Sequence, residues 1–247
     1  MKIGILGCDD VPERFRHLGG SYIDMFRKLL SPHVPDLELQ WFDTRNGEVP
    51  ASADACDAYV CTGSRHSVYD DHDWIEKLKA FVRTLQEKKK PFIGICFGHQ
   101  MLAEALGGEV KPAGYGWGVG VLDMEITKPE PWMDPPQSHA KIQYMHSDQV
   151  QRLPPDSVVL AEAPHCPVAM FRVGETMLGI EGHPEFPAAY VAALVNARRE
   201  RIGEARAEEA LANVDAPVDD AVVARWIANF VFRTNGATGP TSGTAAP

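Results

Sequence analysis

The chain has 247 residues, of which 45% are hydrophobic and 23% are charged, and its formal net charge is −10. A chain of this length and balance can bury a full core as a globular protein. The negative charge disfavours non-specific binding to nucleic acid or to an anionic membrane surface, so we expect neither as a partner.

The cysteines and the N-terminus indicate the compartment. Five cysteines at irregular spacings are too few for a disulfide framework and give no paired zinc motif. The apolar run at the N-terminus, residues 1–6, is too short for a signal peptide or a membrane span. We therefore expect reduced thiols and a cytoplasmic protein.

The first hundred residues alternate short apolar runs with amphipathic stretches. This alternation predicts an α/β fold whose mostly parallel central sheet is flanked by helices. Residues 22–30 and 74–86 have the spacing of apolar residues that is typical of helices. Buried strands are expected at residues 2–6, 37–42, 58–61 and 92–95.

The pattern changes after residue 119. Short β-rich segments separated by proline and glycine predict smaller, partly antiparallel strands beside the main sheet. Helices follow Pro187, and we expect one domain over residues 1–233 with a disordered tail at 234–247. The expected strands are 119–126, 142–145, 157–160, 168–173 and 177–180, and the expected helices are 188–201, 204–213 and 219–232.

Cys96 stands where an apolar strand runs directly into a helical pattern, with Gly94 and Gly98 on either side. This is a cysteine version of the strand–nucleophile–helix turn of hydrolases. The glycines let strand and helix pass closely, and the helix N-terminus is expected to lower the thiol pKa. The backbone N–H of Phe97 is placed to stabilise an oxyanion, a contact typically worth roughly 3–4 kcal/mol.

Two alternatives for Cys96 remain. A buried structural cysteine is common, although a core cysteine needs no strained turn. Zinc binding by Cys96 and His99 is the other alternative, but no second ligand pair supports it.

His183 is the best candidate for the base that a nucleophilic cysteine needs. It ends a short apolar strand, and Glu185 lies two residues further on. Residues i and i+2 of an extended segment project to the same side, so the carboxylate can orient the imidazole. Taken alone, His183 is a structural histidine and Glu185 a helix-start acid; taken with Cys96, they predict nucleophilic catalysis.

Residues 94–100 together with His183-Pro184-Glu185 resemble class I glutamine amidotransferases, in particular the stand-alone group that is similar to the glutaminase domain of GMP synthase. The likeness covers about residues 1–233 and implies a flavodoxin-like fold. It also implies acyl transfer from glutamine or another γ-glutamyl substrate, through a Cys96 thioester, without metal or organic cofactor.

The same resemblance implies further site residues. The backbone of Gly63 and Ser64 falls where the family has its oxyanion loop, although the family more often has Gly-Gly-Pro there. Gln100 is implied to shape the substrate pocket, and its alternative is a local hydrogen bond on a helix. The other implied pocket residues are Gly116, Trp117, His146, Ser147 and Asp148.

Three functions stay open. The chain is a glutaminase that releases glutamate and ammonia for a separate synthetase partner, which predicts low activity alone and an apolar docking face. Alternatively, it is a self-sufficient hydrolase of γ-glutamyl peptides or γ-glutamyl amines, which predicts a roomier leaving-group side. The third function, a non-catalytic regulatory protein, is disfavoured by the intact Cys-His-Glu set.

Two further segments have open roles, and the oligomeric state is not predicted. Residues 65–74 either rim the mouth of the pocket or form a solvated loop and helix start. Arg198, Arg199 and Arg201 are expected on an exposed helix face.

Overall fold

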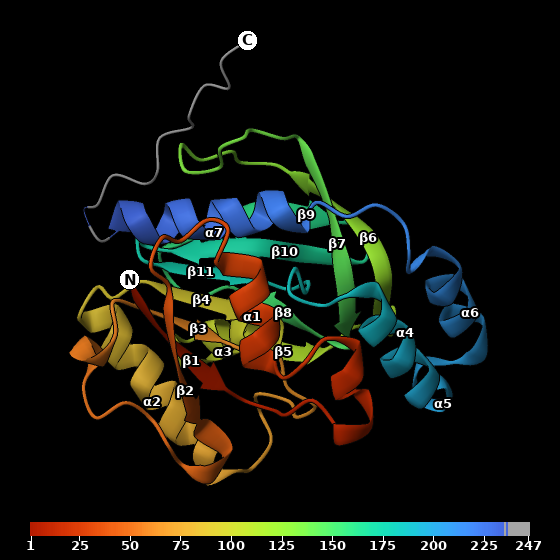
Figure 1. Cartoon of the computed structure of the whole chain (residues 1–247), viewed down its shortest axis with the longest axis horizontal. Helices are drawn as coiled ribbons and strands as arrows, with labels where there is room; N and C mark the ends of the chain where they lie inside the picture. The colour runs from red at the N-terminus through yellow and green to blue at the C-terminus, as the bar shows by residue number, and fades with distance from the viewer. Residues whose placement is uncertain (235, 237–247) are drawn as a thin grey trace.

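The computed structural model describes residues 1–234 and 236, in which a nine-stranded sheet carries helices on both faces (Figure 1). The strand order is β2-β1-β3-β4-β11-β10-β9-β6-β7. The strands are β1 (Lys2–Gly7), β2 (Glu38–Asp43), β3 (Ala58–Cys61), β4 (Phe92–Ile95), β6 (Gly118–Ile126), β7 (His139–His146), β9 (Ser157–Ala163), β10 (Cys166–Val173) and β11 (Met177–Ile180).

Half of the sheet is parallel and half is antiparallel. β2, β1, β3, β4 and β11 pair in parallel, which confirms the predicted α/β class. β10, β9, β6 and β7 continue the same sheet in antiparallel pairs, so the β-rich segments extend the main sheet. A separate two-stranded sheet of β5 (Glu109–Pro112) and β8 (Asp148–Arg152) was not predicted.

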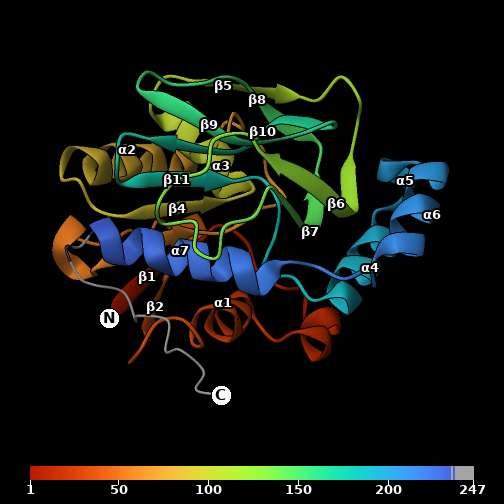
Figure 2. The same ribbon diagram turned by 90° about the horizontal axis from the view of Figure 1, so that it is seen from above.

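The helices cover the two faces unequally. Figure 2 shows α1 and α7 on one side of the sheet and α2 and α3 on the other. The strands of the parallel half alternate accordingly: Ile3 and Ile5 of β1 belong to one apolar cluster and Leu6 to the other. The helices are α1 (Tyr22–Leu30), α2 (Asp73–Glu87), α3 (Phe97–Ala105), α4 (Ala188–Ala197), α5 (Arg199–Ile202), α6 (Glu204–Asn213) and α7 (Asp220–Thr234).

The prediction of one helix over residues 188–201 is wrong. α4 ends at Ala197 and α5 begins at Arg199, because Arg198 has φ −115° and ψ 12°, outside the helical range. The Arg198 N–H is shared between the carbonyls of Leu194 and Val195, which closes the last turn of α4.

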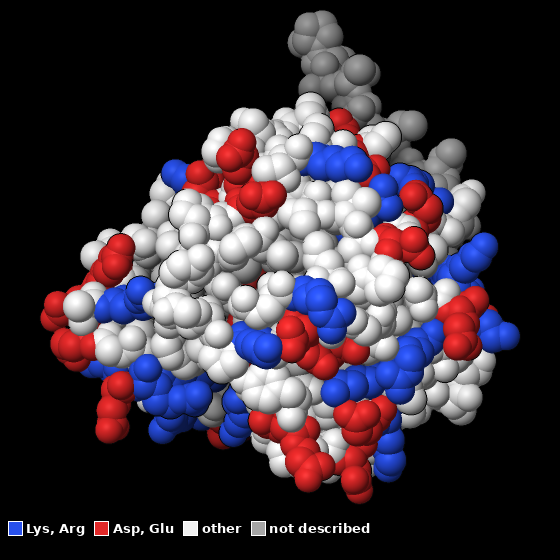
Figure 3. Space-filling model, turned by 180° about the vertical axis from the view of Figure 1, so that it is seen from behind, with Lys and Arg blue, Asp and Glu red and all other residues white. Residues whose placement is uncertain are grey.

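Basic and acidic side chains are interspersed on the face shown in Figure 3. In the described part of the chain, no helix combines the length and the apolar character that a membrane crossing requires. The first residue of the predicted tail, Thr234, ends α7, and the rest of that tail apart from Gly236 lies outside the described residues.

The parallel strands determine where a site can form. β3, β4 and β11 are neighbours in the sheet, and their carboxyl ends lie at the same edge. The segments that leave these three ends begin at Thr62, Cys96 and Glu181. Ligand sites of open parallel sheets form at this edge, so the topology brings the three candidate segments together.

We predict that Gly94→Ala destabilises the fold by about 1–3 kcal/mol or more, because the new Cβ would lie 2.2 Å from the Gly98 carbonyl oxygen. Gly114→Ala is the matched control, because its Cβ meets nothing within 4 Å. Urea unfolding of both variants measures the effect. Equal stabilities would contradict the close approach of β4 and α3.

Candidate active site

Cys96 occupies a strained turn between β4 and α3. Its φ of 50° and ψ of −102° lie in a region that costs a non-glycine residue about 1–3 kcal/mol. The turn is held on both sides, since the Cys96 N–H donates to the Ile180 carbonyl at 2.9 Å and the Cys96 carbonyl accepts from the Gln100 N–H at 2.9 Å. The predicted strand–cysteine–helix turn is therefore present.

The glycine before the turn and the one after it are both required by packing. A Cβ on Gly98 would lie 2.3 Å from the carbonyl oxygen of Cys61, at the end of β3. Together with the equally close approach at Gly94, this contact brings α3 down onto β3 and β4. The thiol is consequently fixed at the sheet edge and is only 5% exposed.

His183 and Glu185 form a buried pair. The His183 Nδ1 lies 2.8 Å from the Glu185 Oε1, and the His183 N–H donates to the Gln143 carbonyl at 2.7 Å. The imidazole stacks on the ring of Phe186 with centroids 3.9 Å apart, and a Cβ on Gly63 would come within 2.7 Å of its Cε1. The ring is therefore held on three sides, with Nδ1 directed to the carboxylate.

The protonation of the thiol differs from the prediction. Burial raises the pKa of Cys96 well above its ordinary value, and the nearby carboxylates of Glu181 and Glu185 raise it further, while the Phe97 N–H acts in the opposite direction. The prediction that the helix N-terminus lowers this pKa is wrong, because removal from water and two acids outweigh it. The resting thiol therefore keeps its proton.

Two cavities meet at Cys96. The smaller, of about 60 Å³, is lined by Phe97 and most of the substrate-pocket residues expected from the sequence. The larger, of about 220 Å³, is lined by His183 and an aromatic wall. Ser64 lines both cavities, as Cys96 does, and Gly63 packs against His183 instead.

The smaller cavity brings together five of the six expected substrate-pocket residues. Gly116, the sixth, is not among its lining residues and lies in an exposed turn with φ 81°. The five that line it are Gln100, Trp117, His146, Ser147 and Asp148.

Gln100 connects distant parts of the chain. Its Nε2 donates to the Asp148 carbonyl at 3.0 Å and to the Glu181 Oε1 at 2.9 Å. The alternative of a local helix hydrogen bond is therefore wrong. These two bonds use both amide hydrogens, which leaves the Gln100 side-chain oxygen as the remaining polar group of this residue.

Glu181 is a site residue that the sequence did not reveal. Its side chain is fully buried, with Oε2 3.4 Å from His99 Nε2 and Oε1 3.4 Å from His146 Nδ1. Burial raises the pKa of Glu181 well above its ordinary value and lowers the pKa of His99 and of His146 to about 3. Burial therefore disfavours the charged form of all three groups. No local pattern marks Glu181, which simply follows the last apolar residue of β11.

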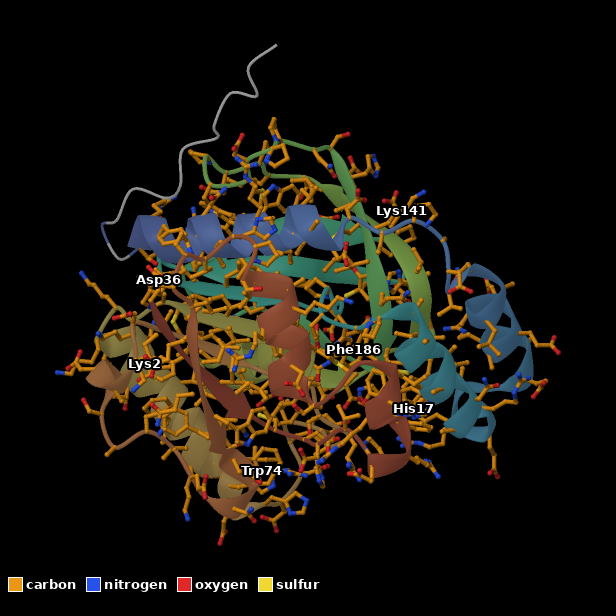
Figure 4. All side chains as sticks on the ribbon, viewed as in Figure 1. Lys2, His17, Asp36, Trp74, Lys141 and Phe186 are labelled. Carbon is orange, nitrogen blue, oxygen red and sulfur yellow. The ribbon has the colours of Figure 1, made fainter. Side chains whose placement is uncertain are left out.

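The larger cavity lies between α1, α4 and the short 3₁₀ helix Glu13–Leu18. Three aromatic rings pack together on its wall, those of Tyr22, Phe186 and Tyr190. The ring centroid of Phe186 lies 5.9 Å from that of Tyr22 and 4.9 Å from that of Tyr190. Figure 4 shows Phe186 beside α1, and Trp74 at the start of α2. The three rings give this side of the cavity an aromatic wall.

Only the start of the segment at residues 65–74 lines the two cavities, and its end, residues 71–74, lines a separate surface pocket. Arg65 binds the Asp9 carboxylate through Nε and Nη2 at 2.9 and 2.6 Å, and His66 lines the smaller cavity. Within the described residues, one cluster has the composition of a metal site: ligand atoms of His66, Asp70 and His72 lie within 4.8 Å of one another. It includes neither Cys96 nor His99, and the expectation of metal-free chemistry stays a prediction.

We predict that Glu181→Gln makes thermal stability less dependent on pH. With its pKa raised above 4.5, Glu181 binds its proton more tightly in the folded state, so its stabilising contribution is complete below about pH 4.5 and is lost as the pH rises toward the folded pKa. Glutamine keeps the acceptor for Gln100 but does not titrate. Thermal unfolding should therefore show a gain in stability over the wild type that widens as the pH rises above about 4.5.

The exposed Glu208→Gln serves as the control for that experiment, and its curve should follow the wild type. A difference between Glu181→Gln and the wild type that stays constant with pH would mean that the Glu181 pKa is not raised.

Sequence comparisons find relatives of this chain among known proteins. γ-Glutamyl peptidase 3 of Arabidopsis thaliana is 32% identical over 188 residues, which cover 72% of this chain and 74% of that protein. The glutamine-hydrolysing GMP synthase of Neisseria meningitidis is 36% identical over 164 residues, which cover 64% of this chain but 29% of that protein.

A solved structure supports the fold, and a family model covers the site. The crystal structure of a glutamine amidotransferase from Thermotoga maritima matches 95% of this chain and 99% of that chain with a TM-score of 0.72, at 18% identity. A family model described as glutamine amidotransferase class-I matches residues 19–189. Because those residues include both the Cys96 turn and the His183–Glu185 pair, the chain belongs to the class I glutamine amidotransferase family.

Proposed function

We propose that this protein is a self-sufficient hydrolase of γ-glutamyl peptides, with Cys96 as nucleophile, His183 as base and acid, and Glu185 as the group that orients His183. The arrangement of the two cavities around Cys96 carries the proposal. Phe97 and Gln100 line the smaller cavity, and His183 lines the larger. A leaving nitrogen must receive its proton from the base, so the leaving group occupies the cavity that contains His183.

The reaction begins when His183 takes the proton of the Cys96 thiol. The sulfur attacks the γ-carbonyl carbon of the substrate, and the N–H groups of Phe97 and Ser64 stabilise the resulting oxyanion. The imidazolium then protonates the nitrogen as the carbon–nitrogen bond breaks, and the amine leaves through the larger cavity. Water, deprotonated by His183, attacks the γ-glutamyl thioester and releases glutamate and the free thiol.

The size of the larger cavity favours a peptide over glutamine as the substrate. Ammonia, the leaving group of glutamine, is about the size of a water molecule, which occupies about 30 Å³ in the liquid. The cavity on the His183 side has about 220 Å³ and an aromatic wall. A relative named γ-glutamyl peptidase supports the same choice.

The partner-dependent glutaminase is the second candidate. It is supported by the likeness to a GMP synthase that is named glutamine-hydrolysing. That hypothesis predicts an apolar docking face. Over the residues that the structure describes, however, Tyr69 and Tyr115 are the only exposed large hydrophobic side chains, at 45% and 60% exposure. The self-sufficient hydrolase is therefore the function that the geometry supports better.

A substrate panel tests the proposal. Purified protein should release glutamate from γ-glutamyl peptides with a kcat/KM at least about tenfold above that for glutamine, which corresponds to about 1.4 kcal/mol of additional transition-state binding in the larger cavity. Cys96→Ala should abolish release from every compound. Turnover of glutamine alone would favour the partner-dependent glutaminase, and equal rates for wild type and Cys96→Ala would sink the catalytic assignment.

Substitutions in the buried pair test the roles of base and orienter. His183→Gln should lower kcat by about 10²–10⁴-fold, the range for loss of a general base. Glu185→Gln should also lower kcat, with KM nearly unchanged. The carboxylate that lies 2.8 Å from His183 Nδ1 is replaced by a neutral amide, so the hydrogen bond that orients His183 loses its charged acceptor. Steady-state kinetics measure both effects.

His139→Gln is the matched control for this pair, since His139 bonds Asp123 at the surface and lines neither cavity. A wild-type kcat in the His183→Gln variant would mean that His183 is neither the base nor the acid of the reaction.

A further inference from the structure

The larger cavity is positively charged in a negatively charged protein. Four arginines and two aspartates line it, an excess of two positive charges, whereas the whole chain carries a formal charge of −10. Its charged lining residues are Arg14, Arg65, Arg198, Arg201, Asp9 and Asp10. An anionic group is therefore the ligand that this cavity attracts.

The two aspartates are already paired with arginines, one in the cavity lining and one outside it. Asp9 is bound by Arg65 at 2.6 Å and by Arg45 at 3.5 Å, and Asp10 is bound by Arg45 at 3.0 Å. Arg45 lies outside the cavity lining. The acids consequently leave the charge of the remaining arginines uncompensated.

Arg198 is the best placed of those remaining arginines. In the described part of the chain, neither Arg198 nor Arg201 has a carboxylate within 4.0 Å or a side-chain hydrogen bond to protein; Arg201 lies over the Trp117 ring, 5.5 Å from its centroid. Arg198 is half-buried; burial raises the pKa of Cys96 and of Tyr190, and the charge of Arg198 acts in the opposite direction on both. Its positive charge is thus felt both at the nucleophile and on the aromatic wall.

The helix break explains how this arginine reaches the site. Arg198 is the single residue between α4 and α5, and Arg201 follows it by three residues, close to one helical turn. Both line the two cavities that meet at Cys96. The prediction that all three arginines of this segment lie on an exposed helix face is therefore wrong for Arg198, whereas Arg199 faces away and pairs with Glu204.

We infer that Arg198, assisted by Arg201, binds a carboxylate of the leaving group, so that the substrates are γ-glutamyl amino acids and peptides rather than γ-glutamyl amines. The inference rests on the proposed function. A guanidinium binds a carboxylate through paired charge-assisted hydrogen bonds, and burial strengthens such bonds. The aromatic wall of Tyr22, Phe186 and Tyr190 lies in the same cavity and accepts an apolar side chain of the released residue.

A matched pair of substrates isolates the carboxylate. γ-Glutamyl-phenylalanine and γ-glutamyl-2-phenylethylamide release the same aromatic group, and only the first releases a carboxylate. The wild type should prefer the first by about tenfold to a hundredfold in kcat/KM, as expected for a hydrogen bond to a charged group. Arg198→Gln should remove this preference, by raising the KM for γ-glutamyl-phenylalanine more than the KM for γ-glutamyl-2-phenylethylamide. Arg198→Lys should restore part of the preference.

Arg199→Gln is the neighbouring control and should keep the wild-type preference, because Arg199 lines neither cavity. Binding of both compounds to the Cys96→Ala protein, measured by calorimetry, gives a second result that does not depend on turnover. The same preference and the same dependence on Arg198 should appear there.

The possible outcomes separate the two proposals. Equal affinity and equal kcat/KM for the pair would overturn the carboxylate assignment while leaving the hydrolase intact. Equal losses for both compounds in Arg198→Gln would also overturn it, because Arg198 would then serve the glutamyl group that the two share. A binding preference without any turnover would support the carboxylate site and overturn the proposed hydrolase.

Discussion

The close contact of α3 with β3 and β4 is the constraint on which the rest of the site depends. It leaves no room for a side chain at Gly94 or Gly98 and holds Cys96 at a positive φ, with its thiol at the carboxyl edge of the sheet. β3 and β11 flank β4 and end at the same edge, so the Gly63 loop and the His183 segment arrive there without long excursions. Three short segments on one rigid sheet thus determine the geometry of the site.

The electrostatics of the site follow from the same burial. Removal from water and the carboxylates of Glu181 and Glu185 keep the pKa of the Cys96 thiol high, so the resting sulfur is the less reactive protonated form. Oxidation and alkylation require the thiolate, and a protonated thiol therefore resists both. In the proposed reaction the thiolate exists only when His183 holds the proton, which is when a substrate carbonyl is in place to be attacked.

The sequence predicts what local patterns encode. Apolar runs correctly indicated the parallel strands, and the i, i+2 spacing of His183 and Glu185 correctly placed their side chains together, at 2.8 Å. The burial of Glu181 was missed because it depends on Gln100 and His146, which are distant in the chain. The sequence also failed to predict the break at Arg198, because neither glycine nor proline marks it. The cavity that Arg198 lines was missed for the same reason.

The two sides of Cys96 carry different information about function. Every member of a family that forms a γ-glutamyl thioester must bind the same acyl group. Residues inferred from the family resemblance, such as Gln100 and Asp148, accordingly lie together in the smaller cavity. The leaving group differs between glutamine and a peptide, and in the proposed reaction it enters the cavity beside His183. Because α4, α5 and the 3₁₀ helix Glu13–Leu18 form that side through long-range packing, the proposed choice of substrate rests on the part of the chain where local patterns carry least information.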